Sequence, residues 1–346
     1  MDKIKWVVVL MCSFLCSCSE QKQALSPPSF YYWQLNNTTD LPLAKLTQLQ
    51  TQHYYIKFMD IDWDATKGLP IPKASLQLSS NLKPLFEKQF SPCFYIQNQV
   101  FLNADSATST DLAQKIAEVL KHKLQQIATT YLLPDVQNKL QEIQIDCDWT
   151  AKSKEQYFFF LQELKKQLAP KTISVTLRLY PYKYPNLMGV PPADKAILMC
   201  YNMDQIKQFA TKNSIYSLDV LKQYVNTTNT YPLPIEVALP IYGWYVWFRN
   251  QQYKGILYAP EFEQLKTSAI AHQPNHFLVD QEFASTSRLF RYGDVIRKEF
   301  PDAAELIEGA KWLQGKIPHI NKFHYFYIDS TNLTNYEKTI HHIQHP

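Results

Sequence analysis

Two pairs of aspartates lie at the ends of apolar segments, and each pair has one residue between its members. Asp60 and Asp62 lie at the end of the run 54–61, and Asp146 and Asp148 lie at the end of the run 142–149. Side chains alternate along a strand, so the two members of a pair point to one face. Crowded carboxylates raise one another's pKa, which is what a general acid needs at neutral pH. The four aspartates are therefore predicted to be catalytic. The alternative is that they cap neighbouring helices and loops.

These aspartates need a frame that brings distant segments together, and recurring apolar runs predict one. Eight runs rich in β-branched and aromatic residues have the length of strands: 30–35, 54–61, 93–102, 142–149, 172–180, 195–202, 235–243 and 322–329. Helix-like stretches separate most of them, at 41–52, 74–90, 110–131, 152–168, 204–226, 302–315 and 333–343. Eight strand–helix units predict an α/β fold of the (β/α)8 TIM-barrel type, with an open doubly wound sheet as the alternative.

In such a barrel the chemistry lies where the strands end. The two aspartate pairs would then meet at one mouth, where Arg178 at the end of the fifth run would neutralise part of their charge. We expect a single barrel domain over residues 30–346, preceded by a tether at 19–29. An insertion at 249–300 is expected to separate the seventh strand from the eighth and to lie beside the barrel mouth.

Composition excludes several classes of protein. With 46% hydrophobic and 19% charged residues, the 346-residue chain predicts a large core and not disorder. Its 7 glycines form no phosphate-binding loop, and its net charge of +4 forms no basic block, so neither a nucleotide cofactor nor a nucleic-acid partner is expected. Cys93, Cys147 and Cys200 lie in or beside apolar runs and are predicted to be buried thiols. No metal and no other cofactor is predicted, and the sequence leaves the oligomeric state open.

The N-terminus has the pattern of an export signal. Lys3 and Lys5 precede the apolar run 6–15, which is too short to span a bilayer. The following segment 15–18 (LCSC) resembles the bacterial lipobox, with Cys18 as the lipid-bearing residue. We therefore expect a signal peptide at 1–18 and a lipid anchor in the bacterial cell envelope, and Ser19 favours the outer membrane. The alternative is an ordinary secretory signal.

Three of the predicted strand ends resemble those of glycoside hydrolase family 18, the chitinase-like barrels. The segment 146–149 (DCDW) resembles the end of the family's fourth-strand motif DxxDxDxE, 199–202 (MCYN) its sixth strand, and 237–243 (VALPIYG) its seventh. The chain also resembles uncharacterised lipoproteins of Bacteroidetes-type bacteria that carry an MxYN strand. The resemblance implies a glycan ligand with N-acetylhexosamine units, which Tyr201 and Asn202 would contact.

The chain departs from the family motif at its catalytic end. Thr150 occupies the position of the Glu that protonates the glycosidic oxygen, and Ile143 replaces the first Asp. A Thr hydroxyl is a very poor proton donor at neutral pH, so the family's mechanism cannot operate unchanged.

Three hypotheses follow. In the first, a glycosidase has relocated its acid, with Asp148 and either Asp60 or Asp62 as the carboxylate pair and Arg178 tuning their charge. In the second, an inactive barrel binds carbohydrate through Tyr201, Tyr242 and the aromatic strand exit that begins at Trp244. In the third, the barrel is a docking surface of an envelope-assembly lipoprotein, because a fold does not determine a function.

Overall fold

The computed structural model describes residues 25–36, 41–226 and 231–345. The predicted signal segment and the lipidation residue Cys18 lie outside these ranges. Within them, no helix combines the length and the apolar character needed to cross a membrane.

Eight parallel strands close into a ring. Each strand pairs with the next, and β1 closes the ring by pairing with both β16 and β2. In ring order the strands are β1 (Ser29–Tyr32), β2 (His53–Asp64), β4 (Gln89–Ile96), β5 (Ile143–Asp146), β6 (Ile173–Arg178), β7 (Lys195–Met199), β8 (Ile235–Pro240) and β16 (Phe323–Phe326). All eight expected runs contribute a strand, so the predicted (β/α)8 barrel is confirmed.

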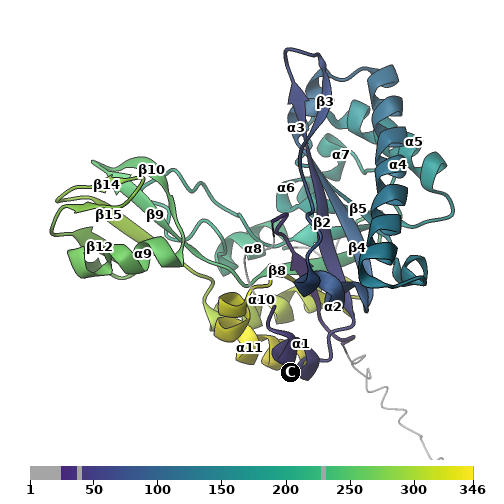
Figure 1. The fold of residues 1–346 in the computed structure, drawn as a ribbon. Coiled ribbons are helices and arrows are strands. Elements are labelled where there is room, and N and C mark those ends of the chain that lie inside the picture. The colour runs from purple at the N-terminus through teal and green to yellow at the C-terminus, as the bar shows by residue number, and fades with distance from the viewer. Residues whose placement is uncertain (1–24, 37–40, 227–230, 346) are drawn as a thin grey trace, which may run out of the picture.

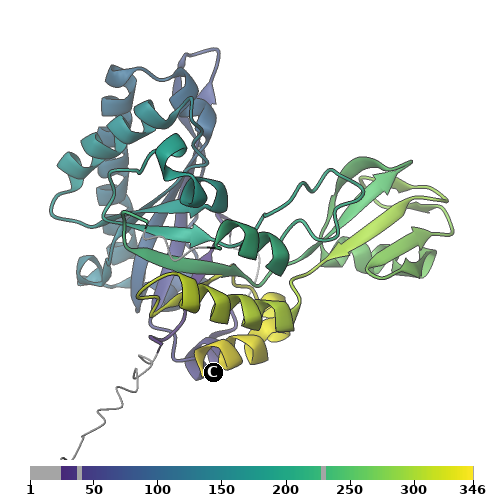
Figure 2. The same cartoon turned by 180° about the vertical axis from the view of Figure 1, so that it is seen from behind.

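Helices lie around the outside of the ring (Figures 1 and 2). In α5 the residues Tyr157, Phe160, Leu161 and Leu164, spaced along one face of the helix, are fully buried. The other helices outside the insertion are α1 (Leu43–Gln48), α2 (Lys83–Phe86), α3 (Asn98–Asn103), α4 (Ser106–Tyr131), α6 (Leu179–Lys183), α7 (Pro185–Met188), α8 (Leu218–Tyr224), α10 (Ala303–Lys316) and α11 (Ser330–Gln344), and α5 itself is Lys154–Leu168.

Three expected elements differ from the structure. The end of the run 93–102 is not strand, because β4 ends at Ile96 and α3 begins at Asn98. The expected helix 74–90 is mostly replaced by the end of β3 (Leu69–Ser75) and short helical turns. Strand β3 pairs antiparallel with the extension of β2 beyond the ring, which forms the hairpin at the top of Figure 1. The expected helix 204–226 contains only α8.

An ionic network fills the end of the barrel where the strands begin. Lys195 Nζ lies 2.6 Å from Glu142 Oε2 and 3.0 Å from Glu236 Oε2. His324 Nε2 lies 2.8 Å from the same oxygen of Glu236. Tyr55 donates a hydrogen bond of 2.8 Å to Glu142 Oε1. Burial holds the pKa of His324 below its ordinary value, so its imidazole is neutral at pH 7.

The insertion between β8 and β16 is a separate antiparallel sheet. Its strand order is β10 (Gln252–Leu257), β9 (Trp244–Arg249), β15 (Val295–Glu299), β12 (His276–Val279) and β11 (Ala269–Gln273). Helix α9 (Ala259–Leu265) packs on this sheet, and Tyr245, Trp247, Phe262 and Ile296 belong to its own apolar core. The strands β13 (Phe283–Ala284) and β14 (Leu289–Phe290) form a small second sheet.

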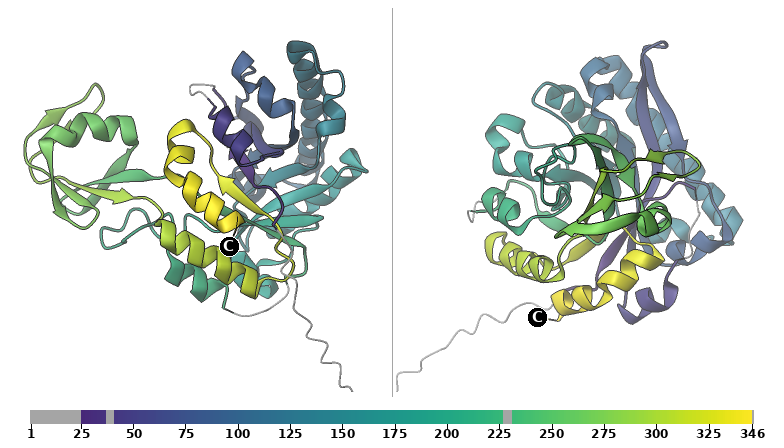
Figure 3. Two further views of the ribbon diagram at one scale, coloured as in Figure 1. Left: turned by 90° about the horizontal axis from the view of Figure 1, so that it is seen from below. Right: turned by 90° about the vertical axis from the view of Figure 1, so that its left-hand side faces the viewer.

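The insertion sheet starts at Trp244, earlier in the chain than the expected boundary at 249, because the run 244–249 pairs with β10 and β15. In the right-hand view of Figure 3 the insertion lies in front of the strand ring.

Candidate functional site

A cavity of about 480 Å³ opens where the ring strands end. Six aromatic side chains line it: Trp33, Tyr95, Tyr180, Tyr201, Tyr224 and Phe326. Five charged or amide side chains also line it: Lys57, Asp146, Asp148, Arg178 and Asn202. Aromatic and hydrogen-bonding groups from most strands of the barrel therefore share one cavity.

Asp146 is the buried acid of this cavity. It is the last residue of β5, and its side chain accepts a hydrogen bond of 2.6 Å from Thr176 Oγ1 on the neighbouring β6. Only 8% of Asp146 is exposed. Burial, and then the nearby charge of Asp148, raise the pKa of Asp146 to about 7. Asp146 therefore exchanges a proton near neutral pH.

Asp148 is held in a different environment. Its side chain is about half exposed, and its Oδ1 lies 3.1 Å from Arg178 Nε at the end of β6. Arg178 Nη2 also donates a hydrogen bond of 2.7 Å to the carbonyl of Trp149. Trp149 is buried and stacks on Tyr157 of α5. Arg178 thus fixes the segment that carries Asp148, as well as compensating its charge.

Tyr201 and Asn202 form the wall beyond β7. Tyr201 stacks on Phe326 with ring centres 4.8 Å apart. Asn202 has a φ of 52°, a left-handed conformation that Asn tolerates better than most residues. Its Oδ1 accepts a hydrogen bond of 2.6 Å from the Tyr242 hydroxyl. Tyr242 is buried behind Asn202 and is not a lining residue, so its expected contact with a ligand is corrected to a contact with this wall.

The structure does not bring all four predicted aspartates into the cavity. Strand β2 shifts register against β4 between Lys57 and Met59, so Lys57 and Asp60 lie opposite Cys93 and Tyr95, which are two residues apart in β4. Lys57 lines the cavity, and Asp60 pairs with its Nζ at 2.6 Å. Asp62 lies in the extension of β2 that pairs with β3 and is not a lining residue. Of the four predicted aspartates, Asp146 and Asp148 therefore line the cavity and Asp60 is paired with the lining residue Lys57, whereas their catalytic roles stay predictions.

Trp244 belongs to the insertion. It is the first residue of β9, and its Nε1 donates a hydrogen bond of 2.8 Å to Glu299 Oε2 of β15. Its ring contacts Tyr242 but is not among the cavity-lining groups. Its predicted role in stacking on a ligand is corrected accordingly.

Thr150 takes part in the turn that begins α5. Its Oγ1 lies 3.2 Å from Ser153 Oγ, and its backbone N–H donates to the same oxygen at 2.9 Å. Ser153 in turn donates to Asn98 Oδ1 of α3. Thr150 is not a cavity-lining residue, so this position supplies a polar turn and no group aimed at a ligand.

Several lining residues were not expected from the sequence. Lys57 Nζ lies 5.0 Å from the ring centre of Trp33 and 5.5 Å from that of Tyr95, so all three make one wall. Trp33 directly follows β1 and Phe326 ends β16, but both lie inside the apolar runs 30–35 and 322–329, so the runs alone did not mark them. Tyr180 and Tyr224 lie on α6 and α8, where no strand-end rule would find them.

Comparison with known proteins bears on the fold. Neither a protein-family model nor a curated protein matches the sequence. A chitinase from Bacteroides thetaiotaomicron superposes with a TM-score of 0.53 at 11% identity, over 93% of this chain and 96% of that one. The chain has the fold of chitinase-like barrels.

Two further structures agree. A fungal endo-beta-N-acetylglucosaminidase from glycosyl hydrolase family 18 gives a TM-score of 0.51 at 9% identity, over 93% of this chain and 99% of the other. A chitinase from Chromobacterium violaceum gives 0.50 at 13% identity, with the same two coverages. The resemblance in fold inferred from three strand ends is therefore confirmed in a strongly diverged sequence.

Proposed function

We propose that the chain binds a glycan with N-acetylhexosamine units in the cavity at the barrel mouth. The observation that carries this proposal is the combination of aromatic walls and hydrogen-bonding groups in one cavity. Pyranose rings present apolar C–H faces and a rim of hydroxyls, so they suit a site that offers both kinds of group. The structures that share the fold are chitinases and an endo-beta-N-acetylglucosaminidase, which supports this ligand class.

Different lining side chains would contact different parts of the glycan. The aromatic side chains that line the cavity, among them Tyr201 and Tyr180, cover apolar sugar faces. The Asn202 carbonyl oxygen already accepts from Tyr242, so its amide nitrogen is the group that can donate to an acetamide oxygen. Asp148 and Arg178 together offer an acceptor and donors to sugar hydroxyls.

The binding test compares two exposed tyrosines. Tyr180 lines the cavity and is 44% exposed, whereas Tyr292 of the insertion is 74% exposed and does not line it. Titration calorimetry with chitohexaose on the full chain in detergent should show binding that Tyr180→Ala weakens about tenfold, which corresponds to about 1.4 kcal/mol. Tyr292→Ala should bind as the wild type does. Absence of binding at millimolar chitohexaose and peptidoglycan fragments would refute the proposal and favour the assembly role.

Hydrolysis is the second candidate function, and Asp146 favours it. Its pKa of about 7 and its place in the cavity suit a group that donates a proton to a glycosidic oxygen. Asp148 would be the partner carboxylate that orients water or the substrate acetamide for attack at the anomeric carbon. Mass spectrometry of chitohexaose after incubation should then show products that Asp146→Asn abolishes. Binding without products would leave the protein a carbohydrate-binding barrel.

We further propose that Cys18 anchors the protein to the bacterial cell envelope, in the outer membrane. The positive residues, the short apolar run and the lipobox-like segment 15–18 support the lipid anchor, and Ser19 supports the outer membrane. Replacing Cys18 with Ala should move the protein from the membrane fraction to the soluble envelope fraction. An unchanged distribution would contradict the lipid anchor.

A further inference from the structure

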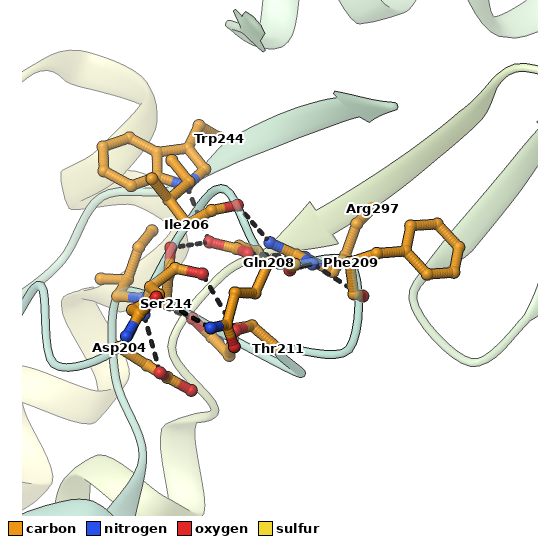
Figure 4. A network of polar contacts seen from close by, with 12 residues as sticks. Asp204, Ile206, Gln208, Phe209, Thr211, Ser214, Trp244 and Arg297 are labelled. Carbon is orange, nitrogen blue, oxygen red and sulfur yellow. Dashed lines mark hydrogen bonds and ion pairs between the residues drawn. The ribbon is translucent and has the colours of Figure 1, made fainter. Parts of the chain in front are cut away.

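A fully buried arginine of the insertion donates hydrogen bonds to the loop between β7 and α8. Arg297 lies on β15, and no part of its side chain is exposed. Its Nη1 donates to the carbonyls of Gln208 and Phe209 at 2.7 and 3.1 Å, and its Nη2 donates to that of Ile206 at 2.9 Å (Figure 4). One side chain that lies about 90 residues further along the chain therefore donates to three backbone carbonyls of this loop, of which that of Gln208 also accepts from the Thr211 N–H at 3.3 Å.

Glu299, on the same strand, binds Arg297 and also the end of the loop. It is also fully buried, and its Oε1 accepts a hydrogen bond of 2.7 Å from Arg297 Nε. Its Oε2 accepts from Trp244 Nε1 at 2.8 Å and from the hydroxyl of Ser214 at the far end of the loop. The guanidinium of Arg297 also lies over the ring of Phe248, with its central carbon 4.7 Å from the ring centre. We call Arg297 and Glu299 the clamp.

The loop bound by the clamp joins two segments that line the cavity. It runs from Asn202 and Met203, which line the cavity after β7, to α8, whose Tyr224 also lines it. Between Met203 and Ser217 the chain forms no helix or strand of its own. Hydrogen bonds within the loop, such as that from the Asp204 N–H to the Ser214 carbonyl at 3.2 Å, hold part of its path, and the clamp adds tertiary contacts at both its middle and its end.

Removing the contacts of the clamp should make the loop and the adjoining cavity wall more mobile. Ile206 and Phe209 are partly buried and Gln208 is exposed, and a partly buried carbonyl that loses its donor destabilises the arrangement that holds it. The loop would then move toward solvent. Asn202 lies two residues before Asp204, so its backbone would no longer be fixed by the segment that follows it. The left-handed backbone of Asn202 makes this position sensitive, since it is held by the Tyr242 hydroxyl on one side and by the loop on the other.

We propose that the clamp is a positioning device: through Arg297 and Glu299 the insertion sets the cavity wall formed by Asn202 and Met203, on which glycan affinity depends. This inference rests on the proposed glycan binding. It assigns no contact between the clamp and the ligand. Both clamp residues act through the loop, so their effect reaches the cavity only as a change in the position and mobility of its wall.

The test uses conservative replacements in the full chain in detergent. Arg297→Lys keeps a positive charge beside Glu299, but a single ammonium cannot span the carbonyls of the loop. Glu299→Gln is the second variant, since it keeps the shape of the side chain and removes the charge. The matched control is Arg249→Lys, because Arg249 lies on β9, pairs with Asp294 and donates to the Leu289 carbonyl without touching the loop.

Two readouts are needed, the affinity for chitohexaose and hydrogen exchange of the amides over 200–217. Arg297→Lys and Glu299→Gln should lower the affinity about tenfold and speed exchange up to Asn202 and Met203, whereas Arg249→Lys should stay within about twofold of wild type. The proposal is overturned if exchange quickens only within 204–214 with affinity unchanged, or if the control weakens binding equally.

These readouts separate the clamp from the glycan proposal. If the wild type does not bind chitohexaose, the proposed function fails for this glycan, and exchange alone decides the clamp. Faster exchange at Asn202 and Met203 in Arg297→Lys, but not in Arg249→Lys, then supports a positioned wall. Unchanged exchange there overturns it.

Discussion

Replacing Asp146 with Asn should change the free energy of unfolding, relative to wild type, more favourably at pH 8 than at pH 5. The pKa of this carboxyl rises from 3.8 to about 7 on folding, mainly because of burial. Between these two values the folded state keeps the proton while the unfolded state has lost it, so the free energy of unfolding falls as pH rises. Each pKa unit corresponds to about 1.4 kcal/mol, which gives roughly 4 kcal/mol of lost stability once the pH exceeds 7.

Asparagine removes this titration and keeps the shape of the site. Its carbonyl oxygen can accept the Thr176 hydroxyl as Asp146 Oδ1 does. The difference in unfolding free energy between Asp146→Asn and wild type should therefore shift in favour of the variant by roughly 2.5 kcal/mol between pH 5 and pH 8. Contributions of titrating groups that do not interact with Asp146 cancel in this difference.

Urea denaturation of both proteins at pH 5, 6, 7 and 8 measures this shift. Asp111→Asn is the control, because Asp111 on α4 is more than half exposed and pairs only with Lys115 on the same helix. Its difference from wild type should stay constant within about 0.5 kcal/mol over this range. A difference for Asp146→Asn that is equally constant would refute the buried proton at this position.

Three further outcomes are expected. Replacing Lys195 with Met leaves the buried Glu142 and the partly buried Glu236 without their shared cation, and urea denaturation at pH 7 should show a loss of about 3 kcal/mol, whereas a change below about 1 kcal/mol would contradict the ionic network. Burial, then Lys322, lower the pKa of His53 well below 6.5, so the unfolded state takes up a proton that the folded state does not, and stability should fall as pH drops below 6.5. His53→Gln should reduce that slope by up to about 1.4 kcal/mol per pH unit, and an unchanged slope would count against it. Tyr242→Phe removes the hydrogen bond to Asn202 and should weaken chitohexaose binding about fivefold with the melting temperature nearly unchanged, while equal affinity would show that this bond does not position the wall.

The strands of the ring were predictable because each is a short apolar segment with both faces buried. Parallel strands covered by helices need no polar alternation, so composition alone marks them. The strand ends also predicted Asp146, Asp148 and Arg178, and the family resemblance added Tyr201 and Asn202; all five line the cavity. Periodicity could not show the register shift between Lys57 and Met59, since a bulge depends on pairing with β4 and leaves no mark in the run itself.

The loop after β7 shows a second limit of local reasoning. The segment 204–226 has enough helix-forming residues to predict a helix, yet the structure has helix only at Leu218–Tyr224. The carbonyls of Ile206, Gln208 and Phe209 accept from Arg297 and not from helical amides. A contact between residues about 90 positions apart overrides the local preference, and a single sequence does not reveal it.

The closure of the ring by β16 has a consequence for synthesis. Strand β1 is among the first parts of the domain to leave the ribosome, but one of its two neighbours, β16, is among the last. Until Phe323–Phe326 is available, β1 and β8 both keep an unpaired edge. Such edges favour pairing with other chains, and contacts this distant in sequence form slowly. Nascent and C-terminally truncated chains are thus the forms of this protein most exposed to aggregation, and they need protection until the last strand arrives.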